Sequence, residues 1–182
     1  MTAPDEPRWL DPRELSSWVR LVSVVELLPG ALDGQLQRDA GLTHFEYLVL
    51  AMLSETPQRR LRMTDLAARV NATLSRLSHV VTRLEKRGYI ARRPCAEDGR
   101  ATNAELTDDG WAKVLDTAPG HVDMARKAVV DVLTAEQMDQ LGTIMAAILG
   151  GLDPAGVLGS RITPAAVDGG PPRQGGPGGQ AA

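Results

Sequence analysis

Apolar residues recur at spacings of three, four and seven along most of the first 150 positions, which is typical of amphipathic helices. The pattern predicts one helix over residues 12–37, with a kink or a break at Pro29. A second helix is predicted over residues 43–54, where Thr43 and Glu46 have the spacing of a capping box. The N-terminal third of the chain is therefore expected to be helical.

Two shorter helices follow, separated by a tight turn. The first is expected to begin at Thr64 and the second at Thr73, since threonine suits an N-cap. The second carries one apolar stripe, formed by Leu74, Leu77, Val81 and Leu84. Its other faces are polar and basic. Such a pair predicts a helix-turn-helix, in which one helix braces the other in the major groove of DNA.

A β-hairpin is predicted directly after this pair of helices. Gly88 suits the C-terminal end of the second helix. Residues 89–93 and 101–106 are compatible with strands, and the Asp98-Gly99 dipeptide between them favours a tight turn. A hairpin in this position is called a wing.

The C-terminal half is expected to be helical up to a polar tail. Thr107 begins a long helical region that Pro119 is expected to kink or interrupt. A last helix begins at Thr134, which forms a capping box with Gln137. These helices and the N-terminal one have more apolar surface than one small core needs, which favours dimerisation. Residues 153–182 are rich in Gly and Pro and predict a disordered tail.

Positive charge is concentrated in one segment. Residues 59–100 contain eleven Lys and Arg and four Asp and Glu, a net charge of +7. The whole chain carries −3, so the remainder carries −10. A basic segment in an acidic chain predicts a polyanionic partner that binds at one place.

Composition argues against several other classes of protein. Cys95 is the single cysteine, and we see no secretory signal and no unbroken apolar run of membrane-spanning length, so a cytoplasmic protein without a membrane partner is expected. The three histidines (His44, His79 and His121) lack the spacing of metal ligands. Without a Gly-rich phosphate loop or a nucleophile-base pattern, neither a cofactor, a metal nor enzymatic activity is expected.

Two consecutive segments resemble a known family. They read DAGLTHFEYLVLAML and, ten residues later, MTDLAARVNATLSRLSHVVTRLEKRGYIARRPCAEDGRATNAELTDDG. These segments contain a first short helix, a recognition helix, a wing and the start of the next helix, in that order. In this order and spacing they resemble the winged helix-turn-helix regulators of the multiple-antibiotic-resistance regulator (MarR) family. The resemblance covers roughly residues 13–150.

The resemblance implies a mainly α fold with a small β-hairpin wing. A single domain over residues 12–152 would contain a winged helix-turn-helix lobe at 43–107, with N- and C-terminal dimerisation helices at 12–40 and 108–152. It also implies a homodimer that represses transcription from a pseudo-palindromic operator in double-stranded DNA. A small apolar or phenolic effector would then release the DNA.

The predicted DNA-binding residues lie on the second short helix, around the wing and just before the first short helix. Arg100 is expected to enter a minor groove, oriented by Asp98. We expect phosphate contacts from Arg62, Arg92 and Arg93. The polar side chains of the second short helix are expected to contact base edges or phosphates. The full set is Arg62, Thr73, Ser75, Arg76, Ser78, His79, Thr82, Arg83, Arg92, Arg93, Asp98 and Arg100.

Several alternatives stay open from the sequence. The wing turn also fits a plain turn with a solvated arginine. Three aromatic residues fit either the lining of a ligand pocket or the core, namely Trp18, Phe45 and Tyr47. Cys95 fits either a redox switch or an inert position at the base of the wing. A winged helix also serves as a protein-interaction or non-specific DNA-binding module without ligand control.

Overall fold

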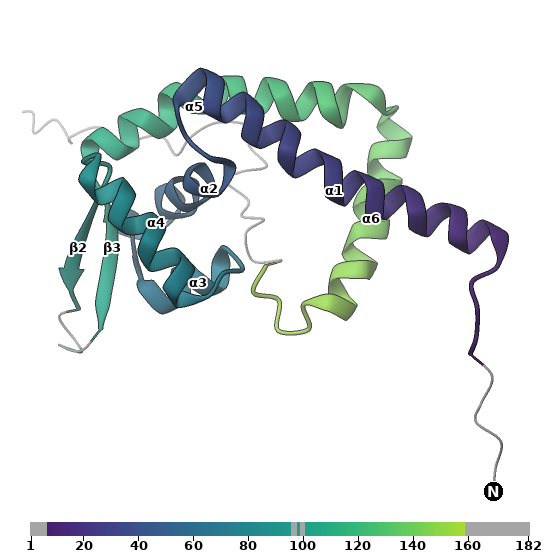
Figure 1. Ribbon diagram of the computed structural model, residues 1–182, viewed down its shortest axis with the longest axis horizontal. Helices are drawn as coiled ribbons and strands as arrows, with labels where there is room; N and C mark the ends of the chain where they lie inside the picture. The colour runs from purple at the N-terminus through teal and green to yellow at the C-terminus, as the bar shows by residue number, and fades with distance from the viewer. Residues whose placement is uncertain (1–6, 96–97, 99–100, 159–182) are drawn as a thin grey trace, which may run out of the picture.

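The chain is mainly helical, with a small sheet that projects from one side (Figure 1). The structure is a computed structural model that describes residues 7–95, 98 and 101–158. The elements, with η for a 3₁₀ helix, are α1 (Pro12–Ala40), α2 (His44–Ser54), η1 (Pro57–Arg59), β1 (Arg60–Arg62), α3 (Met63–Arg69), α4 (Leu74–Lys86), β2 (Ile90–Pro94), β3 (Thr102–Leu106), α5 (Asp108–Ala128), η2 (Val130–Val132) and α6 (Ala135–Leu152). The expected mainly α fold with a small β wing is confirmed.

The sheet has three antiparallel strands in the order β1, β3, β2. The predicted hairpin of β2 and β3 is confirmed, and its pairing ends where Pro94 lies opposite Thr102. Strand β1 was missed by the sequence patterns because three residues are too few to show alternation. It forms on the open edge of β3, where Leu61 lies opposite Ala104.

Parts of two predicted features lie outside the described residues. Asp98 is described and exposed, whereas Gly99 and Arg100 at the wing tip are not described. The minor-groove role of Arg100 therefore stays a prediction. Of the predicted tail, residues 153–158 form turns, in which Asp153 accepts hydrogen bonds from two following amides. The rest, from residue 159 onward, is not described.

The core lies around α2, between α3, α4 and the sheet. Its largest fully buried side chains are Leu36, Leu42, Val49, Leu50, Leu53, Leu66, Leu77, Val81, Leu84 and Ile90. The predicted stripe of α4 is correct except at one end. Leu74 is 49% exposed because it opens the first turn of α4, beyond the edge of the core. Val80 is buried instead.

Four of the five predicted threonine N-caps are confirmed. Each of these hydroxyls accepts a hydrogen bond from an amide in the first turn of its helix, at Thr43, Thr73, Thr107 and Thr134. Thr64 was wrong as an N-cap, since α3 begins at Met63 with Arg62 in the capping position. The chain enters α3 directly from β1, so it becomes helical before it reaches Thr64.

The two internal prolines do not break their helices. α1 continues through Pro29 and α5 continues through Pro119, so a break at either proline is wrong, while the alternative of a kink stays a prediction. Both prolines are exposed, and each removes one helical hydrogen bond and crowds the carbonyl four residues earlier, a cost that the helix packing outweighs. α1 and α5 pack against each other, and this packing keeps both helices continuous (Figure 1).

A close contact joins α5 to the base of the wing. The Thr107 hydroxyl donates to the Gly88 carbonyl at 2.7 Å and accepts from the Gly110 amide at 3.0 Å. A Cβ on Gly110 would lie 2.7 Å from Leu106 Cδ1, and closer still to the Tyr89 carbonyl oxygen. Gly110 thus lets α5 begin against the chain that enters β2, which fixes the lobe on α5.

The terminal helices α1 and α6 extend away from the lobe and expose apolar side chains (Figure 1). No residue of α6 is buried. By length and composition alone, α1 is long and apolar enough to span a membrane. The core helices of soluble proteins meet the same two criteria. The sequence predicts no such span, because it has no unbroken apolar run of membrane-spanning length. No part of the apolar window of α1 is buried within the single chain.

Candidate nucleic-acid interface

Helix α4 divides into a buried face, an outer face and two flanks. The buried face packs on the core through Leu77, Val80, Val81 and Leu84. Ser75, His79 and Lys86 lie opposite this stripe at helical spacing and are exposed. An exposed face of this composition offers donors to base edges and phosphates.

One flank of α4 is held by the first turn of α2. The guanidinium of Arg76 lies over the Phe45 ring, 4.3 Å from the ring centroid. Arg83 Nε donates to Glu46 Oε1 at 3.1 Å, and Arg87 Nη1 lies 3.9 Å from Glu46 Oε2. These contacts tie the predicted DNA-binding residues Arg76 and Arg83 to α2. Both arginines remain exposed at the surface.

Glu46 is the central residue of this flank. Only 6% of it is exposed, and its carboxylate also accepts a hydrogen bond from the Thr43 amide at 2.9 Å. Burial by itself raises the pKa of Glu46, but hydrogen bonds from Thr43 and Arg83 outweigh it and hold the pKa below its ordinary value. Glu46 is therefore a charged anchor for α4 at neutral pH.

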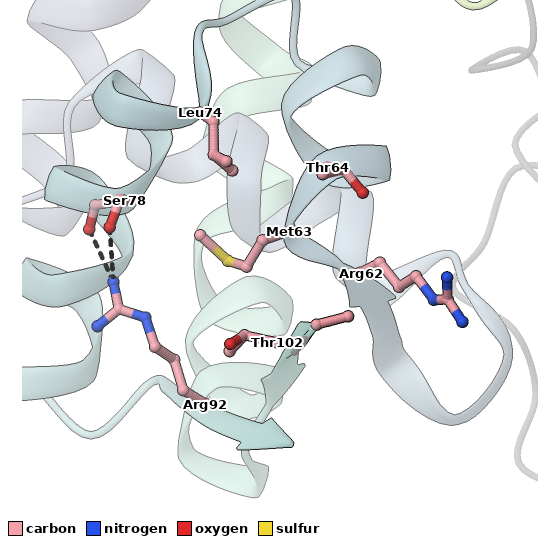
Figure 2. Close-up of a pocket in the computed structure, with 8 residues that line it drawn as sticks. Arg62, Met63, Thr64, Leu74, Ser78, Arg92 and Thr102 are labelled. Carbon is pink, nitrogen blue, oxygen red and sulfur yellow. Dashed lines mark hydrogen bonds between the residues drawn. The ribbon is translucent and has the colours of Figure 1, made fainter. Parts of the chain in front are cut away.

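The other flank of α4 is held by Arg92 of β2. Its Nη1 donates to Glu85 Oε2 at 2.8 Å. Its Nη2 lies within hydrogen-bond distance of the Ser78 carbonyl and of the hydroxyls of Ser78 and Thr82. Figure 2 shows the Arg92 side chain reaching from the strand to Ser78. Three predicted DNA-binding residues, Ser78, Thr82 and Arg92, are thus bonded to one another.

A hollow adjoins each flank. The one beside the wing has a volume of about 290 Å³ and lies between α3, α4 and the sheet, with Leu74, Met63 and Thr102 around it (Figure 2). The other, of about 620 Å³, lies beside α2 and is lined in part by Phe45 and Arg76. The outer face of α4 therefore forms a ridge with a depression on both sides.

The remaining predicted DNA-binding residues lie around this ridge. Arg62 borders the hollow beside the wing, and Figure 2 shows its side chain pointing away from Arg92. Arg93 is exposed near the end of β2. The Thr73 hydroxyl is engaged as the N-cap of α4, where it accepts from the Arg76 amide at 3.2 Å.

Sequence reasoning missed three residues that shape the interface. Lys86 is absent from the predicted DNA-binding residues, although its spacing from His79 places it on the same outer face of α4. Glu46 and Glu85 anchor the two flanks, yet the local pattern marks Glu46 only as the capping-box partner of Thr43 and does not single out Glu85. Their partners become visible only when α2, α4 and β2 are packed together.

The three aromatic residues predicted for a ligand pocket occupy different settings. Phe45 faces Arg76, and the buried Tyr47 ring lies 4.6 Å from the His121 ring. Trp18 is 55% exposed on α1. A shared pocket for the three stays a prediction, and within this chain Tyr47 is a core residue.

The histidines do not form a metal centre in the described part of the chain, where no cluster of three or more His, Cys, Asp or Glu with suitable geometry is found. His44 and His121 instead stack with their ring centroids 6.2 Å apart, at the junction of α2 and α5. Burial lowers the pKa of both, and proximity to His44 lowers that of His121 further. Cys95 is buried, but it lies just beyond the end of β2, where its amide donates to the Ala101 carbonyl, so it sits toward the tip of the wing and its predicted place at the base is wrong.

Comparisons with known proteins point to one family. A model of the MarR family matches residues 42–102. The chain is 50% identical to Sco3205, a MarR family transcriptional regulator from Streptomyces coelicolor solved in complex with DNA, over 83% of this chain and 94% of that one, with a TM-score of 0.78. AbsC, a MarR family transcriptional regulator from the same organism, is 36% identical over 80% of this chain and 98% of its own, with a TM-score of 0.76.

Curated relatives agree over a shorter part of the chain. The HTH-type transcriptional repressor YetL of Bacillus subtilis is 31% identical over 99 residues, which are 54% of this chain and 59% of YetL. The regulator PapX of Escherichia coli is 34% identical over 70 residues, 38% of this chain and 43% of PapX. The chain thus spans about half the length of these two relatives. Together with the nearly complete coverage of Sco3205 and AbsC, these matches show that the chain belongs to the MarR family of DNA-binding transcriptional regulators.

Proposed function

We propose that the chain acts as a homodimeric, sequence-specific repressor on a pseudo-palindromic operator in the cytoplasm. The observation that carries this proposal is the ridge of α4, whose exposed polar face lies between two hollows. A helix in a major groove is bordered by two sugar-phosphate backbones, so a ridge flanked by depressions is complementary to that groove. The 50% identity to Sco3205, solved with DNA, supports the same interpretation.

The residues divide into two roles on this proposal. Ser75 and His79 face the floor of the groove and contact base edges, whereas Lys86, Arg62 and Arg93 contact phosphates. The wing carries its tip toward the neighbouring minor groove, which is where Arg100 was predicted to bind. Base contacts supply sequence preference, and phosphate contacts supply affinity that depends on salt.

The dimer is proposed from the terminal helices. α1 exposes Trp18 and Val25, and α6 exposes Ile144, although such side chains are usually buried. A second copy would cover these faces and place two α4 helices on successive major grooves, about one turn of DNA apart. A palindromic operator follows from that two-fold symmetry.

The remaining parts of the proposal come from the family resemblance. A small apolar or phenolic acid is proposed to release the DNA by binding between the terminal helices and the lobe. Enzymatic activity is not part of the proposal, because regulation by DNA binding needs no turnover. A protein-interaction module is the competing function, and it predicts no preference among DNA sequences.

The proposal is tested by selecting bound duplexes from a random pool and measuring affinity by fluorescence anisotropy against salt. An inverted repeat should be recovered. His79→Ala should weaken binding to that repeat by about 1–3 kcal/mol and relax its sequence preference. Lys86→Ala should weaken all duplexes alike and reduce the salt slope by about 0.9.

Lys127→Ala is the matched control, since Lys127 is an exposed lysine on α5, outside the ridge. It removes the same charge and should leave affinity nearly unchanged. Equal affinity of the wild-type chain for all sequences would contradict the proposed function.

A further inference from the structure

Arg92 belongs to the wing but makes its side-chain bonds to the recognition helix. Two of its donors are directed at α4, with Nη1 2.8 Å from Glu85 Oε2 and Nη2 2.9 Å from the Ser78 carbonyl oxygen. Nη2 also lies 3.0 Å from Thr82 Oγ1. The Arg92 backbone amide adds a bond to Glu85 Oε1 at 3.3 Å. The side chain and the main chain of Arg92 therefore both bind one flank of α4, and we call this set of hydrogen bonds the Arg92 grip.

These contacts leave Arg92 poorly placed to hold a phosphate. Its side chain is 27% exposed, compared with 57% for Arg83. Its charge is already paired with Glu85, and a phosphate would have to replace hydrogen bonds that are formed without DNA. These contacts favour a different role for Arg92 from the predicted phosphate contact.

The position of Arg92 links these hydrogen bonds to the distance between the wing and α4. β2 is bonded along its length to β3, so the hairpin moves as a unit when β2 moves. Arg92 spans the hollow that separates α4 from the sheet. A helix in the major groove and a wing in the adjacent minor groove are separated by one sugar-phosphate backbone, and the width of this hollow sets that separation.

We infer that Arg92 is a positioning residue that holds the wing at the distance from α4 at which both can enter neighbouring grooves. The inference rests on the proposed function, because it concerns how that function is performed. Arg92 acts through Glu85, Ser78 and Thr82 and not through the DNA. Removing the grip should release the wing while α4 stays anchored by Glu46 on its other flank.

The first test compares Arg92→Gln with Arg93→Gln on the selected operator and on an unrelated duplex, over a salt series. Arg93 is the neighbouring exposed arginine, so its loss should weaken both duplexes alike and reduce the salt slope by about 0.9. Arg92→Gln should weaken operator binding about tenfold with an unchanged slope, and should weaken the unrelated duplex less. A slope reduced as in Arg93→Gln would overturn the inference.

The second test uses Glu85→Gln, which retains the shape of the side chain. If Arg92 held a phosphate, removing a negative charge beside it would strengthen DNA binding. If Arg92 positions the wing, the same change loosens the grip and should weaken operator binding severalfold. The opposite signs make this variant decisive even if Arg92→Gln does not fold, which thermal unfolding of each variant would show.

Dimethyl sulfate protection then reports the two grooves separately, since it methylates guanine N7 in the major groove and adenine N3 in the minor groove. In Arg92→Gln and Glu85→Gln, protection of adenine N3 under the wing should be lost while protection of guanine N7 under α4 is retained. Loss of both protections to the same extent would overturn the inference. Failure of the wild-type chain to prefer any sequence would instead contradict the proposed function.

Discussion

The winged helix-turn-helix lobe, residues 43–107, differs from the terminal helices α1 and α6 in how much of its apolar surface is buried within one chain. In the lobe, Leu50, Leu53 and Leu66 are fully buried, and its sheet and helices enclose one core. On the terminal helices, Val25 is 62% and Ile144 is 53% exposed. Figure 1 shows both helices extending away from the lobe.

This difference shows which part of the molecule needs a partner. The lobe buries its apolar side chains within one chain, so its packing does not depend on protein concentration. The terminal helices bury little of their apolar surface within one chain. Covering this surface would contribute a free energy of about 25 cal/mol for each Å² removed from water. On the proposed dimer, the stability of these helices is linked to association.

Charging the exposed apolar face should have the largest effect. In Val25→Lys combined with Ile144→Lys, dimer formation would bury two unpaired charges from each chain, so we expect a loss of at least about 3 kcal/mol of dimer stability. Sedimentation should show a monomer, and the melting temperature should no longer rise with concentration. Ser16→Lys is the control, because Ser16 is exposed and shares its face of α1 with Arg20 and Ser23. An unchanged dimer in the double variant would contradict the proposed role of these helices.

Gly110→Ala should cost the lobe about 2–3 kcal/mol of unfolding free energy, because the added methyl group collides with the Tyr89 carbonyl and with Leu106. Chemical denaturation measures this loss. Gly142→Ala is the matched control, since a Cβ there meets no atom within 4 Å and alanine favours the helix. If both variants were equally stable, the close approach of α5 to the wing would be disproved.

Glu46→Gln should lower the unfolding free energy by about 1–2 kcal/mol at pH 7, because Arg83 and Arg87 lose a buried carboxylate. The pKa of Glu46 is lowered by folding, so its contribution is present above the ordinary glutamate pKa of about 4.3 and is lost as pH falls through the folded value. Denaturation curves between pH 3 and 7 should show a shallower acid limb in the variant. An identical acid limb would exclude Glu46 as its source.

The histidine pair should give the smallest effect. Folding lowers the pKa of His44 and His121, so the unfolded chain binds more protons and stability falls as pH drops through about 6.5. His121→Gln should flatten this dependence, measured as melting temperatures between pH 7.5 and 5.5. This experiment probes the junction where the lobe meets α5.

Much of the fold follows from local patterns in the sequence. Thr43, Thr107 and Thr134 begin helices as predicted, because an N-cap needs only the hydroxyl and the amides of the next turn. The helix-turn-helix, the wing and the basic segment were also visible, since helical periodicity, turn residues and charge are properties of neighbouring positions. The family resemblance depends on the same contiguous residues.

The tertiary structure alone decided which arginines are engaged and by what. Glu46 and Arg83 are 37 positions apart, and Arg92 meets Ser78 across 14 positions, so no pattern of neighbours could reveal either contact. The same holds for β1, which exists only because β3 offers it an open edge 45 residues later in the chain. Local sequence determined the helices and the wing, because their bonds close within a few residues. Packing determined the flanks of the recognition helix, because their partners come from separate elements.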